Sequence, residues 1–237
     1  MPAARLEVRN LCAGYGPTRI ISDMTFQAAA GERLAILGRN GMGKTTLLAT
    51  LMGIATQQGG RIVFGDSDVT GLATSLRARL GAGYVPQNRD IFPSLTVEEN
   101  LSAGLKGRPR AALDEAYVLF PRLAERRRHF GLQLSGGEQQ MLAMARTLLG
   151  HPSILLLDEP LEGLAPVICD ELMEAITQLG TGGHVTVLLV EQQIERALDF
   201  ADRVLVLERG RAAWQGPAAG LRSDRALVER LLGVGVH

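Results

Sequence analysis

The chain has 237 residues, 46% of them hydrophobic, and its 25 Lys and Arg residues balance its 25 Asp and Glu residues. This length suits one large domain, or one domain with lobes, around a sizeable core. The zero net charge argues against a nucleic-acid partner, and two cysteines outside any CxxC spacing are too few for a disulfide framework. Residues 1–10 lack the apolar run of a signal peptide, and no stretch approaches the roughly 20 apolar residues of a membrane span.

The predicted elements fall into three segments. From residue 6 to about 70 the chain is rich in strand-like apolar runs separated by glycine-containing turns. Residues 90–149 lack such runs and are typical of helices. The third segment alternates strands with helices, which predicts right-handed crossovers and an α/β fold with a mainly parallel sheet. Its predicted strands span 154–157, 185–190 and 203–208, its helices span 167–179 and 191–200, and the tail is helical from Ala218.

A strand over 34–37 and a helix over 45–52 flank a glycine-rich run that matches the pattern GxxxxGK[ST]. Glycines let backbone N–H groups surround phosphates, and a helix N-terminus adds partial positive charge. Lys44 would neutralise the β- and γ-phosphates, and the hydroxyl of Thr45 would coordinate Mg²⁺. An ordinary glycine-rich turn would lack this lysine and hydroxyl. The run consists of Gly38, Arg39, Asn40, Gly41, Met42, Gly43, Lys44 and Thr45.

Two carboxylates follow the apolar strand 154–157. Asp158 would stand at the carboxyl end of the strand, where open α/β sheets bind ligands, and is suited to hold Mg²⁺. Glu159 would align the attacking water or accept its proton. A DE pair at a strand end can be a simple strand terminus, but its combination with the glycine-rich run predicts a nucleotide-hydrolysing site.

A second candidate phosphate-binding helix start lies in the helical segment. Ser135 provides a hydroxyl, and the glycines after it leave the backbone amides unobstructed. The run is Leu134, Ser135, Gly136, Gly137, Glu138 and Gln139, followed by Gln140. It resembles the signature motif of ABC ATPases, and the resemblance spans essentially the whole chain. One phosphate-binding loop and one such motif in a single chain suggest ATP sites shared between two chains.

The resemblance implies a P-loop NTPase core of the RecA/F1-like type, an antiparallel β lobe and an ABC-specific helical lobe. The approximate lobes are 1–89 with 150–213 for the core and β lobe, 90–149 for the helical lobe, and 214–237 for the tail. ATP and Mg²⁺ are the implied ligands, and Thr46 joins the implied ATP-binding residues. Tyr15 matches the aromatic residue that stacks on adenine. Gln87 matches the glutamine that reaches Mg²⁺ and the attacking water, and Gln192 stands where most members have the histidine that senses the γ-phosphate.

Within the family, the chain resembles the second ATPase of branched-chain amino acid uptake systems. The strings carrying this resemblance are 93–101, 120–127, 135–142, 163–166 and 189–193. It implies a second ATPase subunit, either a paralogue or a copy of this chain, and transmembrane permease subunits, with a solute-binding protein involved indirectly. It also implies a peripheral location on the cytoplasmic face of the inner membrane.

Several features depart from the usual family pattern. Gln192 cannot become cationic as a histidine can, Leu161 and Glu162 replace the commoner Ser-Leu pair, and Met42 is bulkier than the usual residue, although its side chain can point away from the nucleotide. Three alternative functions remain open at this stage: an importer for urea or amides, a non-transport ABC ATPase in metallocluster assembly, and a non-hydrolysing scaffold.

Overall fold

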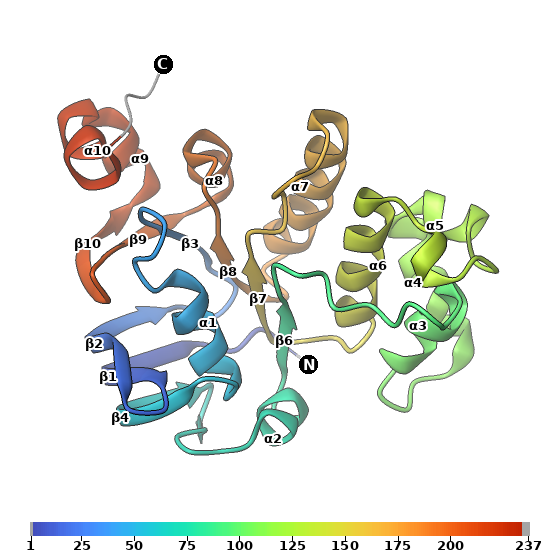
Figure 1. The fold of residues 1–237 in the computed structure, drawn as a ribbon, viewed down its shortest axis with the longest axis horizontal. Helices are drawn as coiled ribbons and strands as arrows, with labels where there is room; N and C mark the ends of the chain where they lie inside the picture. The colour runs from blue at the N-terminus through green and yellow to red at the C-terminus, as the bar shows by residue number, and fades with distance from the viewer. Residues whose placement is uncertain (1, 234–237) are drawn as a thin grey trace.

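The buried apolar runs of the sequence form a six-stranded sheet in the computed structural model, which describes residues 2–233 (Figure 1). Its strand order is β10-β9-β3-β8-β7-β6. All neighbouring strands are parallel except the edge pair β9 and β10, as predicted for most of this sheet. The strands are β3 (Arg33–Leu37), β6 (Ala82–Val85), β7 (Ile154–Asp158), β8 (Thr186–Val190), β9 (Arg203–Glu208) and β10 (Arg211–Pro217).

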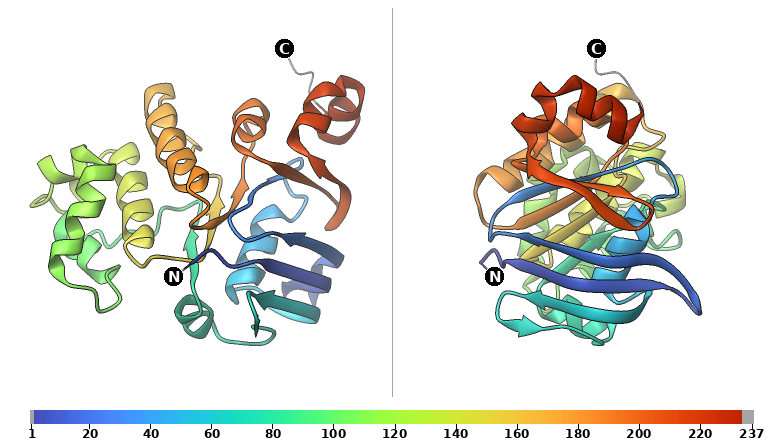
Figure 2. Two further views of the ribbon diagram at one scale, coloured as in Figure 1. Left: turned by 180° about the vertical axis from the view of Figure 1, so that it is seen from behind. Right: turned by 90° about the vertical axis from the view of Figure 1, so that its left-hand side faces the viewer.

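A four-stranded antiparallel sheet lies beside it, in the order β2-β1-β4-β5. The strands are β1 (Leu6–Tyr15), β2 (Thr18–Ala28), β4 (Thr56–Phe64) and β5 (Ser67–Asp68). Leu, Ile, Val, Met and Phe side chains from both sheets and from the helix beside them form one hydrophobic core. The ribbon views in Figure 2 show the two sheets and this helix. The helix, α1 (Lys44–Met52), is therefore packed against both sheets.

The C-terminus of α1 is closed by a buried arginine. Arg77, on α2 (Thr74–Arg79), is 1% exposed and donates hydrogen bonds to the carbonyls of Thr50 at 2.7 Å and Leu51 at 2.9 Å. These carbonyls lie in the last turn of α1 and carry the negative end of the helix dipole, so a cation there is stabilising even though the Gly53 N–H also donates to Thr50 O at 3.0 Å. Arg77 therefore holds the C-terminal end of α1 in place. This contact also helps to fix the N-terminus of α1, on which the phosphate site depends.

The segment 90–149 forms a helical lobe at one end of the molecule (Figure 1). The side chain of Asn100 stabilises the backbone at the start of this lobe. It accepts a hydrogen bond from Phe92 N–H at 2.9 Å and donates one to Phe92 O at 2.9 Å. Arg146 stacks over the Phe92 ring at 4.7 Å. The lobe contains α3 (Val97–Ala103), the 3₁₀ turns Arg110–Ala112 and Gly131–Gln133, α4 (Leu113–Leu119), α5 (Pro121–Glu125) and α6 (Gly136–Leu148).

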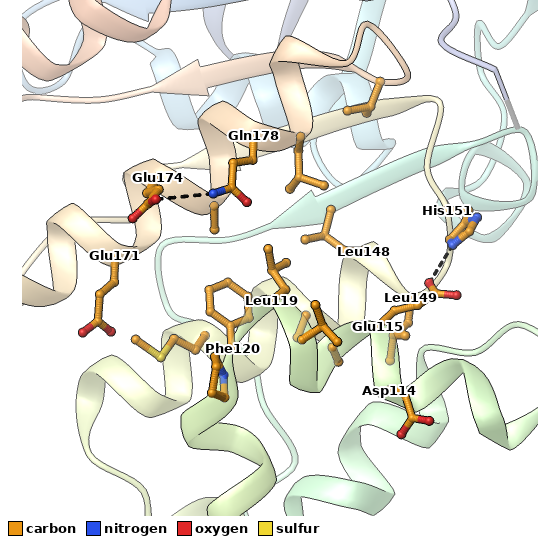
Figure 3. Close-up of a pocket in the computed structure, with 18 of the residues that line it drawn as sticks. Asp114, Glu115, Leu119, Phe120, Leu148, Leu149, His151, Glu171, Glu174 and Gln178 are labelled. Carbon is orange, nitrogen blue, oxygen red and sulfur yellow. Dashed lines mark hydrogen bonds and ion pairs between the residues drawn. The ribbon is translucent and has the colours of Figure 1, made fainter.

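A cavity of about 950 Å³ separates α4 and α5 from α7 (Pro166–Thr181), which belongs to the core (Figure 3). Leu119, Phe120 and Leu148 line its floor, and Glu171 and Glu174 stand on the α7 side. Helix α6 packs against the six-stranded sheet and α7 in one continuous hydrophobic cluster. We infer that α6 is the element that connects the helical lobe to the core.

The helices of the last segment differ slightly from the predicted bounds. The predicted helix 191–200 begins only at Ile194, as α8 (Ile194–Phe200), because the Glu191 side chain accepts the backbone N–H of Gln192 and Gln193 has non-helical dihedral angles. The tail forms α9 (Ala218–Ser223) and α10 (Arg225–Leu232), which pack on β9 and α8. Residues 234–237 of the predicted tail lie outside the described residues. In the part of the chain that the structure describes, no helix is long and apolar enough to cross a membrane.

Candidate ATP-hydrolysis site

The glycine-rich run connects the carboxyl end of β3 to the start of α1. Gly43 precedes the helix with φ of 100°, and a Cβ there would lie 2.9 Å from the side chain of Ile21. A residue with a side chain would be strained in this conformation and would collide with β2. Met42 packs against the core beside it, and its sulfur accepts from Arg209 N–H at 3.2 Å, so its side chain points away from the loop as expected. Arg39, Asn40 and Gly41 are exposed, Gly38 is half-buried and Thr46 is buried.

Lys44 is the buried cation of this loop, only 5% exposed. Its Nζ donates to Gly38 O at 2.8 Å and to Arg39 O at 3.3 Å, and lies 3.7 Å from Glu159 Oε1. The ammonium therefore folds back over the loop and points toward the carboxylates at the end of β7. An anion bound by the loop would meet a positive charge that is already shielded from water.

Thr45 and Asp158 bring two oxygen ligands together from separate elements. Thr45 Oγ1 donates to Asp158 Oδ1 at 3.1 Å, and the hydroxyl of Tyr84 donates to Asp158 Oδ2 at 3.1 Å. Burial raises the pKa of Asp158, the two hydroxyl donors oppose that shift, and the neighbouring Glu159 adds to it. Burial also raises the pKa of Tyr84, with Asp158 contributing, which keeps the phenol protonated as a donor. The role of Tyr84 was missed at the sequence level, where its only signal is its place in β6, three residues before Gln87.

A hydroxyl and one carboxylate are the hard oxygen ligands that Mg²⁺ uses when a substrate phosphate completes its coordination. Among residues 2–233, no group of three or more His, Cys, Asp or Glu side chains is placed to hold a metal ion. The pair formed by Thr45 and Asp158 fits a magnesium ion shared with a nucleotide.

Glu159 follows Asp158 at the carboxyl edge of the sheet and is only 7% exposed. Its backbone is in the left-handed region, with φ of 48°, and its N–H donates to Val190 O at 2.9 Å. Such a conformation costs free energy in a residue other than glycine and persists only where the surroundings impose it. Here it turns the Glu159 side chain toward Lys44.

The two glutamines named from the sequence converge on this carboxylate. Gln192 Nε2 donates to Glu159 Oε2 at 2.5 Å, and Gln87 Nε2 donates to the same oxygen at 3.4 Å. Gln87 also donates to Glu162, which the sequence analysis noted only as a departure from the family pattern. The structure therefore gathers Lys44, Thr45, Gln87, Asp158, Glu159 and Gln192 in one place.

The predicted signature motif begins α6 with reciprocal capping. Ser135 Oγ accepts from Glu138 N–H at 3.3 Å, and the Glu138 carboxylate accepts from Ser135 N–H at 2.8 Å. A Cβ on Gly137 would lie 2.8 Å from Ile168 at the start of α7, so only glycine permits this approach. Leu134 is buried, and Gln139 donates to its carbonyl at 3.2 Å.

The signature motif and the glycine-rich loop do not meet within the chain. In Figure 1, α1 and α6 lie on opposite sides of β6 and β7, and the side-chain hydrogen bonds of Ser135 reach Glu138 alone among the described residues. Arg89, which carries no motif signal in the sequence, places its guanidinium on Gly136, with Nη1 2.9 Å from where a Cβ would stand. Tyr15 ends β1 with 49% of its surface exposed.

Comparisons with known proteins confirm the family predicted from the sequence. The family model described as ABC transporter matches residues 21–162. The chain is 41% identical to the high-affinity branched-chain amino acid transport ATP-binding protein BraG of Pseudomonas aeruginosa, over 92% of this chain and 95% of that one. It is 35% identical to the probable branched-chain amino acid transport ATP-binding protein LivF of Archaeoglobus fulgidus, over 97% and 99%. A bacterial Atm1-family ABC exporter with ATP bound superposes with a TM-score of 0.82 at 31% identity, over 96% of this chain and 42% of the exporter chain.

Proposed function

The chain belongs to the ABC transporter family and is an ATPase, and we propose that it energises an importer for branched-chain amino acids or a related small polar solute. The single observation that supports hydrolysis best is the convergence of Lys44, Asp158 and Glu159 at one edge of the sheet, with Gln192 bonded to Glu159. Import, and this class of solute, are supported by the relatives whose names state branched-chain amino acid transport.

The residues have separable roles in the proposed reaction. Lys44 would exchange its contacts with the loop carbonyls for the β- and γ-phosphates, and Thr45 and Asp158 would hold Mg²⁺, which supplies charge neutralisation on the phosphates. Glu159 would orient the attacking water and accept its proton. Gln192 would hold Glu159 through its amide N–H, and Gln87 would donate to the same carboxylate oxygen.

A second ATPase subunit would complete the site. The amide groups at the start of α6 and the hydroxyl of Ser135 form a donor set that no phosphate bound in the same chain's loop can reach, because β6 and β7 lie between them. Two chains arranged head to tail would bring each signature motif to the other's nucleotide. The partner is either a paralogue or a copy of this chain.

Membrane subunits are the second proposed partner. Phe92, Phe130 and Leu132 are exposed apolar side chains on neighbouring turns of the helical lobe, where Leu132 N–H donates to Pro93 O at 3.1 Å. Clustered exposed apolar residues are typical of protein contacts. We place the chain on the cytoplasmic face of the inner membrane, held by permease subunits, with a solute-binding protein acting through them and no nucleic-acid partner.

Two measurements test this proposal. Purified wild type should hydrolyse Mg-ATP, whereas Glu159→Gln should bind it but turn it over about 10²–10⁴-fold more slowly. Glu162→Gln is the matched control, because Glu162 also accepts from Gln87 but has no contact with Lys44. Wild-type turnover in Glu159→Gln would assign the base to another residue.

The transport assignment requires the native complex. Affinity purification from the cells that make the chain should recover permease subunits and a solute-binding protein, and the binding specificity of that protein identifies the cargo. Recovery with urea or amide permeases would replace the amino acid assignment. Recovery with metallocluster-assembly proteins, without permeases, would refute transport, and a chain that binds ATP without releasing phosphate would be a scaffold.

A further inference from the structure

Glu191 is a buried carboxylate that the proposed reaction leaves without a role. It is 3% exposed and stands between the end of β8 and the loop 160–164 that follows Glu159. Its Oε1 accepts from Leu161 N–H at 3.1 Å. Its Oε2 accepts from Gln192 N–H at 3.0 Å and, more weakly, from Gln193 N–H at 3.5 Å. The two oxygens therefore bind two different backbone segments.

These contacts close a ring that contains both candidate catalytic side chains. From Glu159 the backbone leads to Leu161, the Leu161 amide binds Glu191, and Glu191 is followed directly by Gln192. The Gln192 side chain then returns to Glu159 Oε2 at 2.5 Å. The ring is supported from outside by the hydrogen bond of Glu159 N–H to Val190 O at 2.9 Å. A displacement of loop 160–164 must therefore change the geometry of Gln192 or break a hydrogen bond.

The hydrogen bonds of Glu191 need two acceptor oxygens, which a carboxylate provides. Burial raises the pKa of Glu191, and the backbone N–H groups of Leu161, Gln192 and Gln193 oppose that shift. No Lys, Arg or His side chain among residues 2–233 forms an ion pair with it. A buried charge without a cation is costly, so simple packing would favour another residue. Glutamine has the same shape but only one acceptor oxygen, and its NH₂ group would face a backbone donor.

We propose that Glu191 is a positioning residue for ATP hydrolysis, which couples the backbone of loop 160–164 to the orientation of Gln192 on Glu159. The inference rests on the proposed roles of Glu159 and Gln192. Both oxygens of Glu191 accept from backbone N–H groups, so we assign it an indirect role through Gln192 and the loop. Its two oxygens hold loop 160–164 and the backbone of Gln192 together, so that both segments move as one. Gln192 therefore reaches Glu159 only when Leu161 is bonded to Glu191.

The test compares Glu191→Gln with a control variant at Cys169, a buried residue of α7 that also contacts the loop. Cys169, 2% exposed, contacts the carbonyl of Leu161 with its sulfur at 3.7 Å but does not bind the backbone of Gln192. We expect Glu191→Gln to lower kcat about 10- to 100-fold without changing KM for ATP, as misplacement of a reacting group does. Cys169→Ala should retain wild-type kcat. ATP affinity and melting temperature establish that each variant is folded.

Two further readouts separate positioning from simple support. Because both changes act through one contact, Glu191→Gln combined with Gln192→Ala should be no slower than the slower single variant. Amide hydrogen exchange by NMR should show faster exchange of the Leu161 N–H in Glu191→Gln. Wild-type kcat in Glu191→Gln, an equal loss in Cys169→Ala, or additive losses in the double variant would overturn the inference. An inactive wild type would instead refute the proposed function, and the Leu161 exchange rate would still show whether Glu191 holds the loop.

Discussion

The amide of Gln192 donates a 2.5 Å hydrogen bond to Glu159 Oε2, so the residue that we expect at the position of the usual family histidine contacts the candidate base directly. An amide can donate to a carboxylate or a phosphate, but it cannot become cationic near neutral pH. We expect Gln192→Ala to lower kcat more than it changes ATP affinity, because it removes a contact to Glu159 and none to the glycine-rich loop. Steady-state ATPase assays and calorimetric titration with ATP measure the two effects.

The neighbouring glutamine is the matched control. Gln193 is exposed and has no hydrogen bond to Glu159, so Gln193→Ala should behave as wild type. In a second variant, Gln192→His, kcat between pH 5.5 and 8 should acquire a titration near the histidine pKa of about 6.5 that wild type lacks. Coincident pH profiles together with full activity of Gln192→Ala would remove Gln192 from the site.

Lys44 should contribute more to ATP binding than any other side chain of the loop. Its ammonium is 5% exposed, and charge-assisted hydrogen bonds of this kind are worth about 1.5–3 kcal/mol each. Lys44→Ala should therefore abolish hydrolysis and weaken ATP binding at least about tenfold, as calorimetry can measure. Lys106, the second lysine of the chain, donates to Ala78 O on α2 and forms no hydrogen bond with the loop among the described residues, so Lys106→Ala should bind ATP normally. Unchanged affinity in Lys44→Ala would refute the phosphate-binding loop.

The separation of Ser135 from Lys44 predicts complementation between two inactive chains. Ser135→Arg should block the phosphate held by the partner, and Lys44→Ala should empty its own loop. If two copies of the chain form the dimer, the mixture should regain one working site per mixed dimer, seen as ATPase activity that neither variant has alone. Mixed dimers demonstrated by differential tagging, yet without activity, would argue against a shared site.

Asp202 and Arg33 predict a pH-dependent contribution to stability. Arg33 donates to Asp202 with Nε at 3.2 Å and Nη2 at 2.6 Å, and its backbone N–H donates at 2.9 Å, which joins the starts of β3 and β9. The side-chain hydrogen bond from Arg33 lowers the pKa of Asp202, so the stabilisation is present above the unfolded-state pKa of about 3.9 and is lost as pH falls through the lower folded-state pKa.

Asp202→Asn should therefore lower the melting temperature at pH 7, and the difference from wild type should shrink towards about pH 3. Because Asp202 is 45% exposed, we expect about 1 kcal/mol, or about 2–4 °C in Tm. Asp199→Asn is the control, since Asp199 bonds one exposed arginine on the surface and should change Tm little. A difference in Tm that does not vary with pH would show that the carboxylate charge is not the cause.

The sequence by itself determined the family and the parallel core. Motif spacing predicted Lys44, Thr45, Asp158 and Ser135 as site residues, because phosphate and magnesium chemistry demands particular residue types at particular distances along the chain. The family match confirms the family that these motifs predict. The strands 154–157 and 203–208 were recognisable because strands buried on both faces are continuously apolar.

Edge strands lacked that signal. β2 and β10 are exposed on alternate residues, and β2 carries Asp23 in a left-handed conformation, so neither contains an unbroken apolar run. Their pairing with β1 and β9 comes from hairpin contacts that composition does not encode. The strand prediction therefore missed edge strand β2 of the four-stranded sheet and edge strand β10 of the six-stranded sheet.

Only the tertiary structure decided how the side chains of the site bind one another. Tyr84, Glu162 and Glu191 are ordinary residues in the sequence, and each acquires its contact to Asp158, Gln87 or the Leu161 amide because parallel strands bring distant segments to one edge of the sheet. The burial of Glu191 and the left-handed turn at Glu159 likewise depend on how β7 and β8 pack. Local sequence specifies which chemistry a residue offers, whereas the partners that orient it come from elements far away along the chain.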